Sequence, residues 1–379
     1  MTAVGTLTER ERCLETLLFG TPDRVPFAPG GPRESTLAAW RTQGLGEKED
    51  WWTAVCRHAG VPAGNRGGRT SPGVNFRMIP TFEEKVLSHA NGHYIVQDWM
   101  GNITEISDRY DYTYIRNAID FVTRKWHKFP VESRADFEAM KKRYAVETPG
   151  RFPEDFKARC AKLRERDYVC GVSFSGPFWQ LREWCGFEPL CLLLLDDPDF
   201  AREMIEFWTE FVSRTLRPVL DAGVLDSIHM SEDMAYKAHP MISPGIARSF
   251  LKPAYDRWIA EAKAAGVPLI DMDSDGNIET LIPVWIDAGI NVCDPIEVAA
   301  GNDLNVFRRK FGKRMAYKGG VDKRCIAAGG AVIERELGRL APVVKDGGYI
   351  PGCDHGVPPD ISWPDFLRYG KLLAELTGW

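Results

Sequence analysis

Long apolar runs are scarce in this chain. The longest purely apolar stretch covers residues 190–195, and Asp196, Asp197 and Asp199 follow it closely. A helix that crosses a bilayer needs roughly 20 consecutive apolar residues. The N-terminal segment carries charged side chains ahead of its apolar stretch, which is the wrong order for a secretory signal. We therefore expect no membrane span and a cytoplasmic location.

Paired cysteines and a surplus of basic charge are also absent. The nine cysteines are scattered with no Cys-x-x-Cys pair, which predicts reduced thiols, most of them in the core. Lys and Arg number 48 against 53 Asp and Glu, so the net charge is −5. This balance lacks the basic excess that is typical of nucleic-acid-binding proteins.

The chain also lacks internal repeats, low-complexity tracts and flexible linkers, which favours one domain over residues 1–379. Residues 1–165 form an elaborated N-terminal part, with helical patterns and a hairpin signal over residues 93–106. In residues 166–379, short β-rich runs alternate with helical patterns, as in regular parallel β/α units.

Six β-rich runs lie in this second part and begin at residues 168, 226, 268, 290, 314 and 348. With the RVPFA run at residues 24–28 and one more strand from the first half they make eight, the number in a (β/α)8 barrel. A doubly wound open sheet is the main alternative, but its typical Gly-x-Gly-x-x-Gly turn is absent. We predict an α/β fold, a TIM-type barrel with an N-terminal helical and hairpin elaboration.

The predicted strand ends, where parallel β/α proteins gather their catalytic groups, are acidic. Glu232 and Asp233 end the second run, and we expect Glu232 to face the barrel mouth while its neighbour caps a helix or pairs with a cation. Asp271, Asp273 and Asp275 share one face of the third run if the strand stays regular. Crowded carboxylates raise one another's pKa unless a cation or a proton compensates them. The alternatives are a structural carboxylate at Asp273 and a helix cap at Asp275.

His355 is the most reactive-looking histidine, because it follows Cys353 and Asp354 at the end of the last run and precedes a stiff Val-Pro-Pro segment. It completes a candidate catalytic set with Glu232 and Asp273. His229 lies within a predicted strand, which favours a core histidine.

Three positions near strand ends are candidates for substrate binding. Trp179 and Tyr236 carry rings that can line an apolar pocket, with plain packing as the alternative. Gly320 removes a side chain, so that a ligand can approach the backbone; a tight turn is the alternative there.

Four ordered segments resemble the uroporphyrinogen decarboxylase superfamily: GPFWQLREWCGFE from residue 176, SEDMAYK from 231, KFGKRMAYKGGVDK from 310 and GYIPGCDH from 348. The resemblance implies a (β/α)8 barrel and an enzyme of one of several branches. These include tetrapyrrole decarboxylases, corrinoid-dependent methyltransferases and O-demethylases of methoxylated aromatics.

The motifs of these branches are only partly present. Where the decarboxylases hold substrate propionates with an arginine-rich motif, this chain has GGPREST, in which Arg33 is the only basic residue and hence a candidate substrate contact. Where thiol-activating methyltransferases bind zinc through His-x-Cys and a later Cys, it has Asp273, Asp275 and Cys353. The resemblance thus implies a zinc site of mixed ligands, or none.

No Asp-x-His-x-x-Gly corrinoid-binding motif occurs, so a partner corrinoid protein would supply cobalamin. The leading hypothesis is a methyltransferase or O-demethylase that moves a methyl group from a small methylated, methoxy-aromatic substrate to that corrinoid. A metal or an acid such as His355 or Glu232 would activate the leaving oxygen. The alternatives are a cofactor-independent decarboxylase or lyase of an aromatic or pyrrole acid, and a non-catalytic barrel that binds a tetrapyrrole or a corrinoid protein. A homodimer is compatible with this fold.

Overall fold

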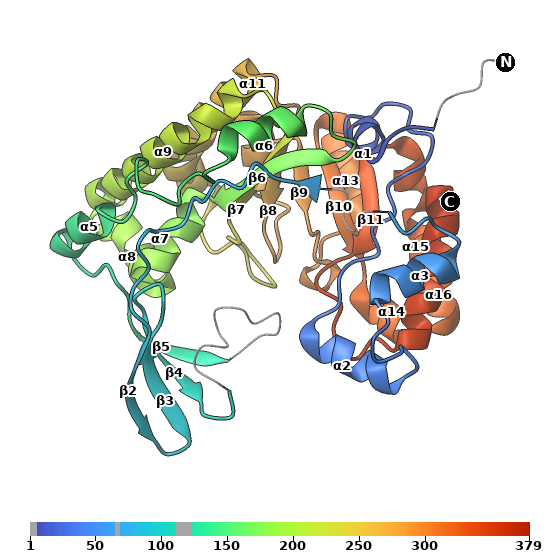
Figure 1. The fold of residues 1–379 in the computed structure, drawn as a ribbon, viewed down its shortest axis with the longest axis horizontal. Coiled ribbons are helices and arrows are strands. Elements are labelled where there is room, and N and C mark those ends of the chain that lie inside the picture. The colour runs from blue at the N-terminus through green and yellow to red at the C-terminus, as the bar shows by residue number, and fades with distance from the viewer. Residues whose placement is uncertain (1–5, 65–68, 111–122) are drawn as a thin grey trace.

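The computed structural model describes residues 6–64, 69–110 and 123–379. Its centre is a curved parallel sheet with helices along its outer side, and a second, antiparallel sheet extends away from it (Figure 1). In these described ranges no helix combines the length and the apolar character needed to cross a membrane.

All pairings in the curved sheet are parallel, and its strands follow chain order. The predicted six β-rich runs of the second part all form strands, because each buries apolar side chains on both faces. The strands are β1 (Arg69–Thr70), β6 (Val169–Ser175), β7 (Ser227–Ser231), β8 (Leu269–Asp273), β9 (Val292–Asp294), β10 (Ala316–Val321) and β11 (Tyr349–Cys353).

The RVPFA run is extended but is not one of these strands. It leads into a segment beside β11, where the backbone N–H of Cys353 donates to the oxygen of Pro29 at 3.3 Å. In the described ranges, β1 and β11 are the two edge strands of the curved sheet, and no other strand connects them. The structure confirms an α/β fold with a curved parallel sheet, as in part of a TIM-type barrel, whereas the described strand pairings do not form the predicted eight-stranded closed barrel.

Helices connect the strands, and α9 is the longest of those described. Asp197 accepts a hydrogen bond from the N–H of Phe200 and thereby caps α9, whose apolar stripe packs against the core. The connecting helices are α7 (Pro177–Cys185), α8 (Phe187–Asp196), α9 (Pro198–Asp221), α10 (Pro244–Ile246), η2 (Ala247–Leu251), α11 (Lys252–Ala264), α12 (Ile282–Ala288), η3 (Val298–Ala300), α13 (Leu304–Phe311), η4 (Gly312–Arg314), α14 (Lys323–Ala328), α15 (Gly330–Asp346) and the final α16 (Trp363–Thr377).

The N-terminal part contributes short helices and a four-stranded antiparallel sheet. The predicted hairpin is confirmed as β3 and β4, with Ile95 opposite Glu105. The helices are α1 (Glu9–Leu17), α2 (Glu34–Thr42), α3 (Trp51–Ala59), α5 (Arg134–Lys141) and α6 (Phe156–Leu163). The sheet has the order β2 (Lys85–Ala90), β3 (His93–Gln97), β4 (Ile103–Ser107) and β5 (Arg124–Lys128).

Helix α1 covers the amino-terminal ends of the later parallel strands. Its residue Leu17 packs with Leu269, Val292, Ala316 and Ile350, which lie at the starts of β8 to β11. Because this end of the sheet is filled by apolar side chains, the polar groups of the strands lie deeper and at the opposite, carboxyl-terminal end.

Candidate active site

A group of charged side chains occupies the concave face of the curved sheet, one from each of five strands. Lys318 on β10 bonds Asp271 on β8 and lies 2.9 Å from Asp294 on β9. His229 on β7 approaches Asp271 at 3.1 Å, and Arg69 on β1 approaches it at 3.6 Å. We call these five residues the interior cluster.

The charges of the interior cluster compensate one another. Burial opposes ionisation of Asp271, but Lys318 and the hydrogen bond from His229 outweigh it and hold the pKa of Asp271 well below its usual range. Burial also opposes the charge of Lys318, yet Asp271 and Asp294 raise its pKa. The pKa of His229 is raised for the same reason, through Asp271. His229, expected as a core histidine, is therefore part of a polar network.

Asp273 lies at the end of β8, two residues beyond Asp271 and on the same face of the strand. Burial, followed by the nearby carboxylate of Asp294, raises the pKa of Asp273 to about 7. Among the described residues, no hydrogen bond or ion pair is formed by this carboxyl group. Asp273 is thus a carboxyl group that carries a proton close to neutral pH, as a general acid requires.

Asp273 lines a pocket of about 410 Å³ at the carboxyl-terminal ends of β6, β7 and β8. We call it the mouth pocket. Its wall is rich in aromatic rings, and its floor carries Ser173, Ser175, Ser231 and Asp273. The remaining lining residues come from an irregular segment after β1, the β3–β4 turn, the segment after α5, β6 and α7: Val74, Asn75, Phe76, Arg77, Met78, Trp99, Met100, Tyr144, Phe174, Trp179, Gln180 and Glu183.

The expectation that Glu232 faces the mouth is wrong. Its side chain is fully buried, and its carboxylate accepts a hydrogen bond from the backbone N–H of Trp179 at 2.9 Å and another from the hydroxyl of Tyr255. Burial raises the pKa of Glu232 to about 7. Because exposed N–H groups at a helix start attract an anion, Glu232 caps α7 instead of reaching the pocket.

Asp233, the neighbour of Glu232, pairs with Arg182 of α7. Arg182 donates to the Asp233 carboxylate at 2.9 Å and to its backbone oxygen at 3.0 Å. These bonds hold Asp233 at a φ of 39°, which is unusual for a residue other than glycine. Both carboxylates at the end of β7 therefore anchor α7, which brings Trp179 to the mouth pocket.

His355 lies at the same end of the sheet but does not line the mouth pocket. Its Nε2 is 3.1 Å from the carboxylate of Asp275, and this hydrogen bond raises the pKa of His355 despite its partial burial. Strand β8 ends at Asp273, so Asp275 leaves the face shared by Asp271 and Asp273. His355 and Asp275 form a second polar pair, with Arg33 near enough to influence it.

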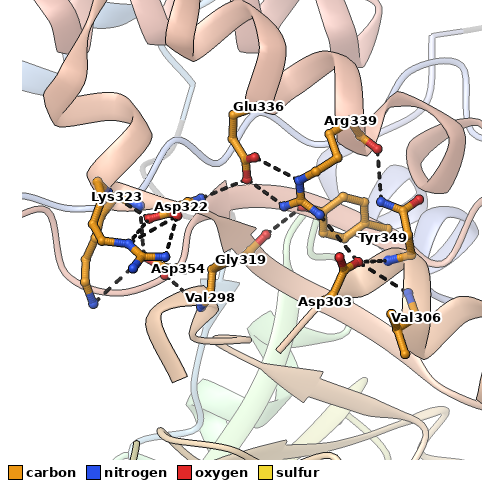
Figure 2. A network of polar contacts seen from close by, with 12 residues as sticks. Val298, Asp303, Val306, Gly319, Asp322, Lys323, Glu336, Arg339, Tyr349 and Asp354 are labelled. Carbon is orange, nitrogen blue, oxygen red and sulfur yellow. Dashed lines mark hydrogen bonds and ion pairs between the residues drawn. The ribbon is translucent and has the colours of Figure 1, made fainter. Parts of the chain in front are cut away.

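A network behind β10 and β11 holds the segment that carries His355 (Figure 2). The buried carboxylate of Asp354 accepts hydrogen bonds from the backbone N–H of Val298 at 2.9 Å and of Lys323 at 3.2 Å. Glu336 accepts from the backbone N–H of Asp322 and from the guanidinium of Arg339. The loops after β9, β10 and β11 are thereby tied together, so His355 is presented from a well-supported turn.

The expected metal ligands Asp273, Asp275 and Cys353 are not brought together. Cys353 is buried against the segment at Gly30, and burial raises the pKa of its thiol to about 12. Asp275 is engaged with His355, and Asp273 faces the mouth pocket. Their predicted alignment fails because β8 ends before Asp275.

One other group of three residues has ligand atoms close enough to one another to hold a metal ion. Throughout the described ranges, only His229, Asp271 and Asp294 place three ligand atoms within 4.8 Å of one another. Asp271 and Asp294 each keep one buried oxygen without a hydrogen-bond partner in those ranges. The Lys318 ammonium, however, already lies between these two carboxylates, where it would repel a cation. This donor set does not fit a zinc site, and we derive no step through a metal.

The structure places the four predicted substrate-binding residues in different surroundings. Trp179 lines the mouth pocket, as expected. Arg33 lies beside the turn at Gly356, away from that pocket, and Tyr236 is 51% exposed and packs against His239. At Gly320 an added Cβ would meet Leu304, so its open side faces the protein interior and the expected ligand approach there is wrong.

Sequence reasoning missed the residues that cover the mouth pocket from the N-terminal part. Arg77 and Trp99 lie far in the chain from β6, β7 and β8, whose ends form this pocket, and no motif marks them. Lys318 carried a weak signal, since this basic residue lies within a β-rich run, whereas Arg69 lies in a glycine-rich stretch that gave none. Their role became visible only when neighbouring strands placed them against Asp271.

Comparisons with known proteins agree with this architecture. The family profile described as Uroporphyrinogen decarboxylase (URO-D) matches residues 121–366. The uroporphyrinogen decarboxylase of Nocardia farcinica (strain IFM 10152) is 29% identical over 190 residues, 48% of this chain and 51% of that protein. The one from Bacillus cereus (strain G9842) is 35% identical over 127 residues, 32% of this chain and 33% of that protein. The matches therefore span about half or less of these relatives.

A solved structure, a methyltransferase from Methanosarcina mazei, superposes with a TM-score of 0.59 and covers 98% of both chains at 14% sequence identity. At this level of identity the likeness concerns the fold. It shows that this architecture, including its N-terminal part, occurs in an enzyme that transfers methyl groups.

Proposed function

Because the chain belongs to the uroporphyrinogen decarboxylase family, we propose that it is an enzyme of the methyltransferase branch. Its substrate would be a small methoxy-aromatic compound bound in the mouth pocket, and its methyl acceptor a reduced corrinoid held by a partner protein. The observation that carries this proposal is the position of the Asp273 carboxyl group in the lining of an aromatic pocket, where burial raises its pKa to about 7.

The size and lining of the mouth pocket favour a single-ring substrate. About 410 Å³ accommodates a compact aromatic molecule among Phe76, Trp99, Phe174 and Trp179. A tetrapyrrole with many carboxylates needs a larger space and several cations, whereas Arg77 is the lone Lys or Arg among the described lining residues. A corrinoid ring also exceeds this volume, which agrees with an acceptor that approaches on a partner protein.

In this reaction the protein must activate a poor leaving group, the oxygen that is bonded to the methyl carbon. A reduced corrinoid supplies the nucleophile that accepts the methyl group. The bond between methyl carbon and oxygen breaks, its electron pair stays on oxygen, and the Asp273 proton moves to that oxygen. Asp273 is left as a carboxylate, which the nearby positive charge of His229 favours. Solvent then returns the proton.

The test is methyl transfer from guaiacol, veratrole and related methoxybenzenes to free cob(I)alamin, followed by absorbance and by release of the demethylated phenol. We expect turnover with at least one compound, and loss of about a hundredfold or more in Asp273→Asn. Asp256→Asn, at an exposed helix position, is the matched control. Absence of methyl transfer across the panel, or full activity in Asp273→Asn, would overturn the proposal.

Decarboxylation is the second candidate, favoured by Arg77 in the pocket that holds Asp273. Arg77 would orient a substrate carboxylate, the bond to that group would break with release of CO2, and the Asp273 proton would go to the ring carbon. Release of CO2 from pyrrole-2-carboxylate without any corrinoid, and its loss in Arg77→Met, would establish this reaction in place of methyl transfer.

A further inference from the structure

A second cavity, of about 500 Å³, lies between the antiparallel sheet and the α7–α8 region. We call it the side pocket. Trp126, Phe129, Trp179 and Phe187 contribute rings to its wall, and Met100 and Met241 contribute flexible thioethers. Flat rings and polarisable sulfur atoms together favour a planar apolar ligand.

One cation in the side pocket lacks hydrogen-bond acceptors for part of its guanidinium group. Two nitrogens of Arg124, Nε and Nη1, are buried and have no hydrogen-bond partner in the described ranges. The other arginine of the pocket, Arg182, is engaged with Asp233 at 2.9 Å. Buried donors without an acceptor are costly to a protein and are uncommon in native structures. The Arg124 guanidinium is therefore a site at which an anion would be stabilised.

The carboxylates nearest to Arg124 do not fill this role. Asp98 influences the pKa of Arg124 but uses its oxygens on the backbone N–H groups of Met100 and Asn102 and on the Asn102 side chain. Glu183 accepts a hydrogen bond from the indole of Trp179 at 2.8 Å, and burial raises its pKa. Neither carboxylate accepts a hydrogen bond from Arg124 among the described residues.

The side pocket also presents an unused acceptor. The Oδ1 atom of Asn102 is buried and unpartnered in the described ranges, while the Nδ2 atom donates to Asp98 at 3.1 Å. A ligand that carries an N–H or O–H group beside its anionic group would satisfy both Asn102 and Arg124.

We propose that the side pocket is a second binding site, for a small aromatic monoanion whose acidic group pairs with Arg124. The rings of Trp126, Phe129 and Phe187 enclose the aromatic part. Arg124 and Trp126 do not line the mouth pocket, although Met100, Trp179 and Glu183 border both cavities. The acidic group of the ligand would therefore bind outside the mouth pocket.

The test uses two fluorescent probes that differ in one charged group. Anilinonaphthalenesulfonate carries an anionic group and an N–H donor, and N-phenylnaphthylamine is its neutral counterpart. We expect the dissociation constant of the sulfonate to rise about tenfold in Arg124→Met, with little change for the neutral probe. Arg124→Lys retains the charge and should recover part of the affinity.

Two further variants locate the bound probe. Lys125→Met, one position along the same strand and absent from the pocket lining, is the matched control for charge and should bind both probes as the wild type does. Trp126→Leu should weaken both probes. Equal sulfonate affinity in the wild type and Arg124→Met, with both proteins folded by circular dichroism, would overturn the proposal and mark the cavity as a general apolar surface only.

Discussion

On strand β8 the carboxyl groups of Asp271 and Asp273 share one face, yet their pKa values move in opposite directions. Desolvation raises the pKa of both groups, so it does not separate them. Lys318 and His229 hold Asp271 as a carboxylate, whereas Asp273 has no such partner and feels the negative charge of Asp294. One strand thus supplies a fixed anion and, next to it, a protonated acid at the mouth pocket.

The raised pKa of Asp273 predicts a pH-dependent stability. The folded protein holds a proton that the unfolded chain releases above its pKa of 3.8. The resulting stabilisation is complete below that pKa and lost once pH passes the folded pKa of about 7. Relative to the wild type, Asp273→Asn should therefore become more stable as pH rises from about 4 to about 7, by up to about 4 kcal/mol over that window.

Urea denaturation of both proteins at a series of pH values measures this difference. Asp256→Asn should show no such trend, because Asp256 is half exposed and pairs with Lys252 on the surface. A difference between Asp273→Asn and the wild type that stays constant with pH would show that Asp273 titrates normally.

Removal of Lys318, the central cation of the interior cluster, should strongly lower the stability of the folded protein. Lys318→Met leaves Asp271 and Asp294 as neighbouring buried carboxylates without their ammonium partner. We expect a loss of about 3–5 kcal/mol in the free energy of unfolding. Combining it with Asp294→Asn should recover part of that loss. Lys252→Met, in an exposed pair, should cost less than about 1 kcal/mol.

Glu232 should matter for stability more than for chemistry. Glu232→Leu leaves the N–H groups at the start of α7 and the Tyr255 hydroxyl without their acceptor, and should cost about 3 kcal/mol. Glu232→Gln keeps an acceptor oxygen and should cost only about 1 kcal/mol. Thermal unfolding compares the two. A Glu232→Gln protein of wild-type stability without activity would assign Glu232 a direct catalytic role instead.

The pair between His355 and Asp275 should stabilise the folded protein at acidic pH and lose this effect as pH rises. The pKa of His355 is raised, so its stabilisation is complete below the unfolded value of 6.5 and is lost as pH rises through the folded value. His355→Gln should destabilise by no more than about 1 kcal/mol at acidic pH and progressively less at alkaline pH. His58→Gln, at an exposed helix position, provides the comparison. A penalty that grows with pH would contradict this assignment.

Local pattern was sufficient to predict six of the seven described parallel strands and the β3–β4 hairpin, but not β1. Alternation along β8 placed Asp271 and Asp273 on one face, and the clustering of acidic groups at strand ends pointed to the mouth. The sequence could not show which of the adjacent carboxylates Glu232 and Asp233 lies beneath α7, because this depends on how the chain turns at the end of β7. In the structure Glu232 caps α7, and Asp233 pairs with Arg182. The strand length of β8, which removed Asp275 from the expected metal set, also depends on tertiary pairing with β9.

Contacts between residues far apart in the chain could not be predicted from the sequence. Arg77 and Trp99 cover the mouth pocket only because the segment before β2 and the β3–β4 turn fold back over the strand ends. The buried nitrogens of Arg124 that lack a hydrogen-bond partner in the described ranges likewise depend on the tertiary fold, and no spacing of residues in the sequence predicts them.

The account depends above all on Asp273 as an acid near neutral pH, and NMR titration of protein carrying aspartate labelled at the side-chain carboxyl carbon measures this directly. Asp273→Asn identifies the resonance by its disappearance. We predict a midpoint of about 7 for that resonance. A midpoint near the ordinary aspartate value of about 4 would contradict the account, because Asp273 would then have no proton to give at neutral pH.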